Sequence, residues 1–294
     1  MRIAELASRA FELARRFLFE PIDARVYAAV RASYGLASLA IVIELWPMRK
    51  LLFCADGALV RTDLPFYLPL RWVDSEAAVS ALMIAMGMFA VFTAVGLFTR
   101  VSTAAMYLWA FSYGSVASPA ETGYDALARL VGLALLVSPT IRSWSVDARL
   151  FGPGPAEVPR YGLRLLQWQL AIVYAVTVWL KLPDPYWRNG EFMTYFMMSI
   201  FSRAPSAVWV EWGRAMALAS WGSLLLETTI PILLFTPRAR RLGIWGGILL
   251  HGGIAIASTI GMFSLCMVPL FAAFLTAEDF EAVMSRPAKE TAVA

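Results

Sequence analysis

The sequence is poor in the residues that build metal centres, disulfide frameworks and soluble surfaces. Its 294 residues include one histidine, two cysteines and only 16% charged residues. A single histidine excludes a multi-histidine zinc or haem site, and Cys54 and Cys266 form no CxxC motif, so we expect no metal and no disulfide. Soluble domains carry about 25% charged residues, so this composition argues against a soluble protein.

Apolar residues dominate the chain instead, at 60% of the total. A run of about twenty such residues can cross the roughly 30 Å of hydrocarbon in a bilayer. Runs of this kind occupy 27–46, 77–98, 101–118, 125–139, 162–182, 215–236, 242–259 and 261–276. We therefore predict an all-α, polytopic membrane bundle of about eight transmembrane helices, with one short interfacial or re-entrant helix between the fifth and sixth.

The first twenty residues predict an amphipathic helix rather than a signal peptide. Apolar residues recur there at helical spacing, with arginines and glutamates on the other faces. The apolar positions are Ile3, Leu6, Ala10, Leu13 and Phe17. We expect this helix over 1–20, lying in the interface or on the ends of the bundle, then a transmembrane domain over 21–276 and a cytoplasmic tail over 277–294.

The net charge of +4 indicates a membrane, not a nucleic acid, as the partner. The arginines are scattered beside apolar runs, as they are on cytoplasmic loops. Counting basic residues on alternate loops predicts that both termini are cytoplasmic and that Lys181 lies on the outer side. We expect a lipid bilayer as the surroundings.

Lys181 closes the apolar run Leu163–Leu182, and a polar, proline-rich segment follows it. An ammonium costs about 2.5–3.5 kcal/mol at the centre of a transmembrane helix and less near its ends. Two interpretations remain open. The lysine either extends to the interface as an anchor, or it is a desolvated amine that serves as a base.

Four further ionisable side chains lie within predicted spans. Glu227 and His251 are near the middle of theirs, so each needs a partner or a wet cavity, and a Glu–His contact is as acceptable as a functional role. Arg31 is expected to extend to the cytoplasmic face. Arg129 follows Asp125 by four residues, which predicts an ion pair on one helix face.

A short amphipathic stretch separates the fifth and sixth spans. Its apolar side chains include Phe192, Tyr195, Phe196 and Ile200, with methionines between them. We expect it to lie in the outer interface or to dip into the membrane, where it would cover Lys181.

Several segments together resemble a known family. They are IVYAVTVWLKLPDPYWRNG (172–190), HGGIAIASTIGMFSLCMVPLF (251–271), Arg31 in AAVRASYGLASL, Asp56-Gly57, and Trp144-Ser145-Val146-Asp147. Over about residues 18–276 the chain resembles the vitamin K-dependent γ-carboxylase-like membrane domain, also called the HTTM domain. The resemblance implies a helical membrane fold with its site on the outer side.

The resemblance also implies a chemistry. In the carboxylases, the matched lysine deprotonates vitamin K hydroquinone, the quinolate reacts with oxygen, and the strong base so formed removes a proton from peptide glutamate. Lys181 would then be the base, and His251 and Glu227 would orient the quinol, which is vitamin K-like or menaquinol. The candidate substrate- or cofactor-binding residues are Trp187, Tyr195, Arg31, Asp125 and Met262.

Two departures argue against glutamate carboxylation. The carboxylases have an Asn-His pair where this chain has Glu121-Thr122-Gly123-Tyr124-Asp125, and the chain ends without their large lumenal domain. Short bacterial members are similar to the membrane component of a sporulation-delaying peptide toxin maturation system.

Three functions follow from the sequence. The first is a quinol-dependent oxidoreductase that modifies a peptide or lipid at the outer face. The second is a non-enzymatic membrane partner for maturation or export of a secreted peptide, together with co-encoded maturation proteins. The third is a proton-coupled transporter that uses Glu227 and His251, although no inverted repeat is evident.

Overall fold

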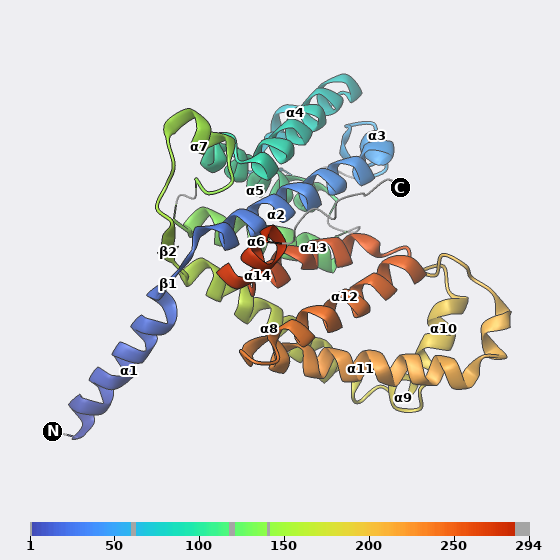
Figure 1. Ribbon diagram of the computed structural model, residues 1–294. Coiled ribbons are helices and arrows are strands. Elements are labelled where there is room, and N and C mark those ends of the chain that lie inside the picture. The colour runs from blue at the N-terminus through green and yellow to red at the C-terminus, as the bar shows by residue number, and fades with distance from the viewer. Residues whose placement is uncertain (1, 60–62, 118–120, 140–141, 286–294) are drawn as a thin grey trace, which may run out of the picture.

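The computed structural model of the chain describes residues 2–59, 63–117, 121–139 and 142–285. Nearly all regular structure in these residues is helical, which confirms the all-α prediction (Figure 1). The one exception is a two-stranded antiparallel ribbon of β1 (Pro21–Asp23) and β2 (Glu157–Pro159). Of the predicted tail, residues 277–285 are described, and residues 286–294 lie outside the described part.

The helices differ greatly in length. The longer ones are α1 (Arg2–Phe19), α2 (Ala24–Leu45), α4 (Glu76–Val95), α5 (Thr99–Val116), α6 (Gly123–Val137), α8 (Tyr161–Lys181), α11 (Gly213–Phe235), α12 (Arg240–Ala257) and α13 (Gly261–Ala272). The shorter ones are α3 (Arg49–Phe53), α7 (Val146–Phe151), α9 (Pro185–Arg188), α10 (Phe192–Met198) and α14 (Ala277–Met284). In the described part of the chain, 3₁₀ turns cover Trp46–Met48, Pro69–Trp72 and Ala207–Val210.

The long helices form two groups that α13 joins. Helices α2, α4, α5 and α6 make one group, whereas α8, α11 and α12 make the other, with α9 and α10 beside α11 (Figure 1). Helix α13 packs against α2 and α6 on one side and against α8 and α12 on the other. This arrangement places the end of α8, where Lys181 lies, in the second group.

Helix α2 is the most buried helix of the first group because small residues let its neighbours approach. Gly35 faces α4, where an added Cβ atom would collide with the backbone of Ala90 and Ala94. Only glycine allows the two helix backbones to come this close. The large side chains of Tyr27 and Tyr34 are almost fully buried and lie against Gly162 of α8 and Gly132 of α6.

Four helical stretches of the described residues are long and apolar enough to cross a membrane: Ala24–Phe53, Glu76–Val95, Tyr161–Lys181 and Gly213–Phe235. A fifth is possible if α13 and α14, which meet at a bend of 104°, count as one broken span. The predicted number of eight is therefore not confirmed. At 1.5 Å per residue, α6 and α13 extend only about 22 and 18 Å, which is short of the hydrocarbon thickness.

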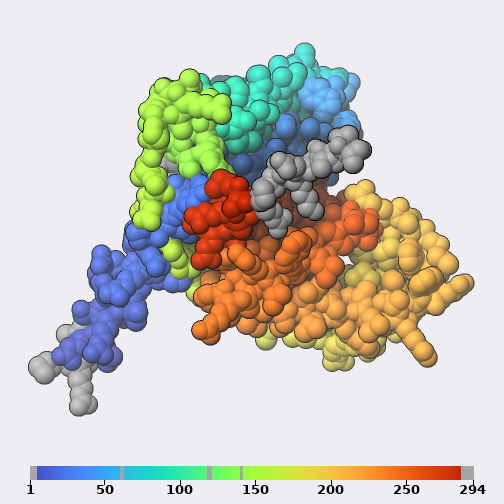
Figure 2. Space-filling view, in the orientation of Figure 1, coloured from blue at the N-terminus to red at the C-terminus, as the bar shows by residue number. Residues whose placement is uncertain are grey.

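Helix α1 forms where the amphipathic pattern predicts it, and it projects away from the rest of the molecule (Figure 2). Leu6, Phe11 and Leu13 are largely exposed on it. Its last turn contacts the bundle, where the Phe17 ring meets the Trp168 ring edge-on at 6.4 Å. A basic helix with an exposed apolar face is typical of the membrane interface.

The prediction that Arg31 extends to the membrane surface is wrong. Its side chain is buried, and Nη2 donates to the carbonyl oxygen of Trp144 at 2.7 Å. Nη1 donates more weakly to the carbonyl oxygen of Ser143, at 3.4 Å. The guanidinium thus holds the loop before α7 against α2, and these contacts help to keep Trp144 in its unusual backbone conformation, with φ of 45°.

Asp147 fastens the same loop to the start of α5. Its carboxylate accepts hydrogen bonds from the backbone of Phe98 at 2.7 Å and from the backbone and hydroxyl of Thr99 at 2.9 and 2.7 Å. Burial acts to raise the pKa of Asp147, but these hydrogen bonds outweigh it and lower the pKa. The bonds satisfy the first amides of α5, which have no partner inside the helix.

Asp147→Asn is expected to lower the free energy of unfolding by about 1–2 kcal/mol at neutral pH, because an amide cannot accept all three bonds. Since the pKa of Asp147 is lowered in the folded state, its contribution is complete above the unfolded value of about 3.9 and is lost as the pH falls further. Unfolding in detergent, followed by circular dichroism between pH 3 and 7, measures both effects. Asp56→Asn, at an exposed carboxylate, should change little.

Candidate functional site

Lys181 forms an ion pair inside the second helix group. Lys181 is the last residue of α8, and its Nζ donates to Glu227 Oε1 at 2.6 Å and to Oε2 at 2.8 Å. Glu227 comes from the middle of α11, which packs against α8. The Glu227 side chain is only 9% exposed and that of Lys181 is 22% exposed, so the amine is paired and mostly buried rather than a free anchor.

An aromatic stack lies directly beside the amine. Nζ of Lys181 is 4.3 Å from the centre of the Trp187 ring, a cation–π contact, and Trp187 is stacked on Phe192 with ring centres 3.9 Å apart. Pro185 begins the short helix that carries Trp187, and Asp184 caps it by accepting from the Tyr186 amide at 2.8 Å. The Lys-Leu-Pro-Asp-Pro segment thus turns the chain back over the end of α8.

Gly190 lets the returning chain lie close against α11. Its φ of 78° is in the left-handed region, where side chains are disfavoured. An added Cβ atom would also lie 2.8 Å from Cβ of Ala217 and 3.0 Å from the Trp221 ring. A glycine is therefore required at the end of the Tyr-Trp-Arg-Asn-Gly sequence.

The ion pair lies in the wall of a cavity of about 620 Å³ between α10, α11 and α12. Apart from Lys181, Glu227 and Ser223, the residues that line it are apolar or glycine. They are Trp187, Phe192, Met193, Phe196, Met197, Met216, Ala219, Gly222, Leu226, Leu249, Leu250, Gly253, Ile254, Ala257 and Ile260. The cavity therefore offers one charged pair in an otherwise apolar wall, as small-molecule sites commonly do.

Helix α10 covers this cavity, as the amphipathic stretch after Lys181 predicts. Its start is tied to α11, because the Met193 amide donates to the Ser220 hydroxyl at 3.0 Å. The segment after it is tied to the end of α12. There the Arg203 amide donates to the carbonyl oxygen of Ala257 at 3.0 Å, and the Thr259 amide donates to that of Phe201 at 2.8 Å.

His251 pairs with a tyrosine and not with Glu227. Its Nε2 is 2.8 Å from the hydroxyl of Tyr174, and both side chains are buried. The imidazole Nδ1 is buried and has no hydrogen-bond partner among the described residues. Phe263 and Phe271 flank the ring. The Glu–His contact that the sequence left open is therefore replaced by two separate pairs, Lys181–Glu227 and Tyr174–His251.

Tyr174 is the residue of this site that the sequence interpretation missed. Tyr174 and Lys181 are seven residues apart on α8, so they lie on the same face about 10 Å apart. The seven-residue spacing between Tyr174 and Lys181 was the only signal in the sequence for this residue. It does not show which buried polar group faces Tyr174. His251 neighbours Leu250 on α12 but does not itself line the cavity.

The remaining candidate residues lie elsewhere. Tyr195 is on α10 but largely exposed, with its ring edge-on to Tyr186, and Met262 is partly buried at the start of α13. Neither lines the cavity, and the same is true of Arg31 and Asp125. Their roles as ligand-binding residues stay predictions.

The predicted Asp125–Arg129 pair does not form. Asp125 accepts from the Tyr113 hydroxyl at 2.8 Å and from the Thr122 amide at 2.7 Å, which closes a capping box at the start of α6. Arg129 donates to Glu121 instead. The helix cap therefore competes for the carboxylate more effectively than the arginine one turn later.

Comparison with known protein families tests the family resemblance that the sequence segments indicate. The HTTM domain matches residues 19–278, which is most of the chain. The chain belongs to the HTTM domain family. No solved structure matches it. Together with its long apolar helices, the family assignment makes this HTTM chain an integral membrane protein.

The Lys181–Glu227 pair of this HTTM protein can hold one proton in two places. With the proton on Nζ, an ammonium faces a carboxylate; with it on an Oε atom, a neutral amine faces a carboxylic acid. Lys181 can act as a base only in the second arrangement, in which its amine is neutral.

Proposed function

We propose that this HTTM protein is a quinol-dependent oxidoreductase that modifies a peptide or lipid at the outer face of a bacterial plasma membrane, with Lys181 as the base. The observation that carries the proposal is the position of the Lys181 amine. It lies in the wall of a large apolar cavity, beside a carboxylate and an aromatic ring.

The cavity fits a quinol in size and in chemistry. Its volume of about 620 Å³ is within the roughly 300–1,000 Å³ of small-molecule sites, and its wall of methionine, leucine and phenylalanine suits a flat ring with a prenyl chain. A quinol, when bound, supplies acidic hydroxyl groups and two electrons for an oxidant such as dioxygen. The stack of Trp187 and Phe192 offers a flat surface for such a ring.

Each residue of the site has a distinct task in this proposal. The pair is ionic in the empty site; when the quinol binds, Glu227 takes the proton from Nζ, and the neutral Lys181 amine then accepts a hydroxyl proton. After the transfer, the Lys181 ammonium stays beside the negative charge that it has created and stabilises it. The apolar side chains and α10 exclude water, which strengthens this electrostatic interaction.

Filling the cavity is expected to remove the ligand. Gly222 lines the cavity, and a Cβ atom added to it would meet nothing within 4 Å, so Gly222→Phe places a ring in the open space without disturbing the helix contacts. Mass spectrometry of organic extracts from protein purified out of quinone-containing membranes should find a quinone with the unmodified chain. At least tenfold less should accompany Gly222→Phe, because the ring occupies the ligand volume.

Gly213→Phe is the matched control for this experiment. Gly213 is on the same helix, also has nothing within 4 Å of an added Cβ atom, and does not line the cavity. The control should retain the quinone. If no quinone accompanies the unmodified chain, or if both variants retain it equally, the proposal is wrong. A non-enzymatic role in peptide maturation or export then becomes the better interpretation.

A further inference from the structure

A second cavity lies at the opposite end of α8 from Lys181. Its volume is about 560 Å³, and it is bounded by α8, the α11–α12 connection, the α13–α14 bend and the β1–β2 ribbon. Arg164 is seventeen residues before Lys181 on α8, which corresponds to about 25 Å along the helix axis. This separation is close to the thickness of the hydrocarbon core, so the two cavities face opposite sides of the membrane.

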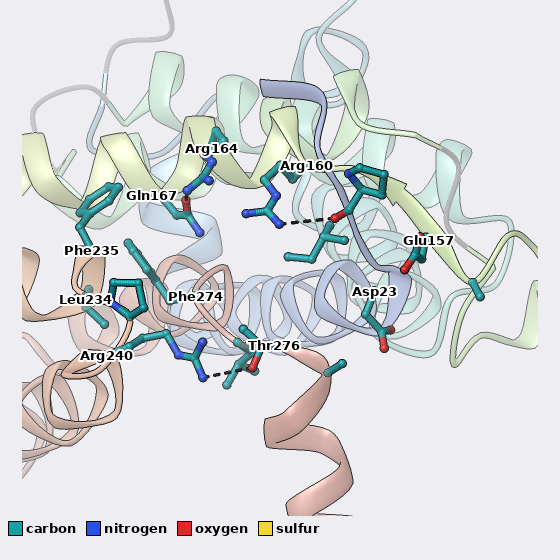
Figure 3. A pocket seen from close by; sticks show the side chains of 16 residues that line it. Asp23, Glu157, Arg160, Arg164, Gln167, Leu234, Phe235, Arg240, Phe274 and Thr276 are labelled. Atoms are coloured by element: carbon teal, nitrogen blue, oxygen red, sulfur yellow. Dashed lines mark hydrogen bonds between the residues drawn. The ribbon is translucent and has the colours of Figure 1, made fainter. Parts of the chain in front are cut away.

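Three arginines line this second cavity from two sides (Figure 3). Arg160 and Arg164 come from the start of α8, and Arg240 lies across from them at the start of α12. Arg164 donates to the carbonyl oxygen of Phe17 at 3.1 Å and to Gln167 Oε1 at 2.8 Å, and no carboxylate among the described residues pairs with it. The arrangement therefore leaves positive charge at Arg164 that the protein does not neutralise.

The other two arginines are only partly neutralised. Arg240 shares Asp279 with Arg241, at 2.8 and 3.3 Å, and its buried Nε has no hydrogen-bond partner among the described residues. Arg160 is 3.2 Å from Glu20, whose side chain is 56% exposed. Arginine donors that converge on one space favour a phosphate group, whose oxygens accept several of them at once.

The acidic side chains that line the cavity do not neutralise the positive charge of the three arginines. Asp23 is already bound to Arg25, with Nη2 2.5 Å from Oδ2, and that ion pair lowers the pKa of Asp23. Glu157 is exposed and, with Asp23, lies at the end of the cavity away from Leu234 and Phe235 (Figure 3).

The remaining wall is apolar and continues from the arginines. Leu234, Phe235 and Phe274 form it, and Phe274 packs edge-on against Phe235 at 5.3 Å (Figure 3). A free phosphate would leave this wall and most of the cavity volume unused. A molecule with a phosphate at one end and hydrocarbon at the other would contact both.

The position of α1 places this cavity at the level of lipid headgroups. The last turn of α1 docks on α8 at Arg164, whose guanidinium lies 4.2 Å from the centre of the Phe17 ring. The rest of α1 exposes apolar side chains and basic residues in the manner of a helix that lies in the interface. The arginines are therefore at the depth where phospholipid phosphates lie.

We propose that this second cavity binds an anionic glycerophospholipid, with its phosphate between Arg160, Arg164 and Arg240 and its acyl chains along Leu234, Phe235 and Phe274. This lipid site is separate from the Lys181 cavity and does not depend on the proposed quinol chemistry. An anionic headgroup is favoured over a zwitterionic one because the arginine charge exceeds that of the carboxylates that pair with it.

Native mass spectrometry of the full chain, released from detergent micelles, tests the proposal with phosphatidylglycerol and phosphatidylcholine as probes. The unmodified chain should retain phosphatidylglycerol about tenfold more strongly than phosphatidylcholine. Arg164→Gln should lose most of this preference, whereas Arg149→Gln, which removes an exposed arginine on α7, should keep it. Equal retention of both lipids, or the same loss in both variants, would overturn the proposal.

Two further measurements keep the result unambiguous. Because Arg164 also holds α1, its replacement could act through the fold, so Ala156→Trp blocks the cavity while it leaves all three arginines in place. This variant should also lose phosphatidylglycerol; full retention would contradict the site. Inorganic phosphate alone is the second probe, and displacement of the lipid by an equal concentration of it would overturn the lipid assignment in favour of a free anion.

Discussion

Lys181→Met is expected to lower quinol oxidation under air by about 10³-fold, because a positioned general base contributes roughly 10²–10⁴-fold and methionine cannot accept a proton. Methionine keeps the length and apolar contacts of the lysine stem, and Glu227 can then remain protonated in the apolar cavity. Quinol absorbance, followed with purified protein in detergent, measures the rate. Quinone retention should be largely unchanged, since the apolar wall that holds the ring is intact.

Lys50→Met is the control for this substitution. Lys50 is the other lysine that the structure describes, and its side chain is 56% exposed near Asp56 and Glu76. The rate should be unaffected by its replacement. A Lys181→Met protein that oxidises quinol as fast as the unmodified chain would end the assignment of Lys181 as the base.

Removing one partner of the Lys181–Glu227 ion pair is expected to have the largest effect on the free energy of unfolding. Glu227→Leu leaves the Lys181 ammonium in an apolar wall without its carboxylate, and breaking a buried pair in this way costs about 3–5 kcal/mol. Because Lys181 is 22% exposed, we expect a smaller loss of about 2–3 kcal/mol in the free energy of unfolding. The double variant Lys181→Met with Glu227→Leu should recover most of this loss, since it leaves no unpaired charge.

Unfolding of the single and double variants in detergent provides the comparison. The double variant should recover most of the stability and yet oxidise quinol about 10³-fold more slowly than the unmodified chain. If the ion pair were only structural, the double variant would be stable and would oxidise quinol at the rate of the unmodified chain. An additive loss in the double variant would show that the two side chains do not interact energetically, contrary to their 2.6 Å contact.

Much of the helical architecture could be predicted from the sequence. The all-α class, the amphipathic α1 and the cover over Lys181 follow from apolar periodicity and from the proline-rich turn after the lysine. The number of spans could not be fixed, because some apolar runs are too short to cross the bilayer as single helices. The apolar run 125–139 forms a helix of about the same length, and the run 261–276 ends as a helix at Ala272, before a sharp bend.

The partners of the buried polar residues were the harder part. Each of Lys181, Glu227 and His251 could be identified as needing a partner, because an isolated charge or polar group in hydrocarbon is costly. The partner of each side chain depends on how α8, α11 and α12 are rotated and shifted relative to one another. A sequence pattern does not specify these positions. Arg31 shows the same limit: its partners are backbone carbonyls of a loop more than a hundred residues away, and backbone atoms leave no signature in a sequence.

The protonation of a phenol bound next to Lys181 tests the central mechanism most directly. A naphthol resembles the quinol ring but is resistant to oxidation under these conditions, and its absorption spectrum distinguishes the neutral from the ionised form. When naphthol binds at pH 7, the unmodified chain should ionise it, while Lys181→Met should bind it in the neutral form. Naphthol that stays neutral in the unmodified protein, or is equally ionised in both, would contradict a base at the end of α8.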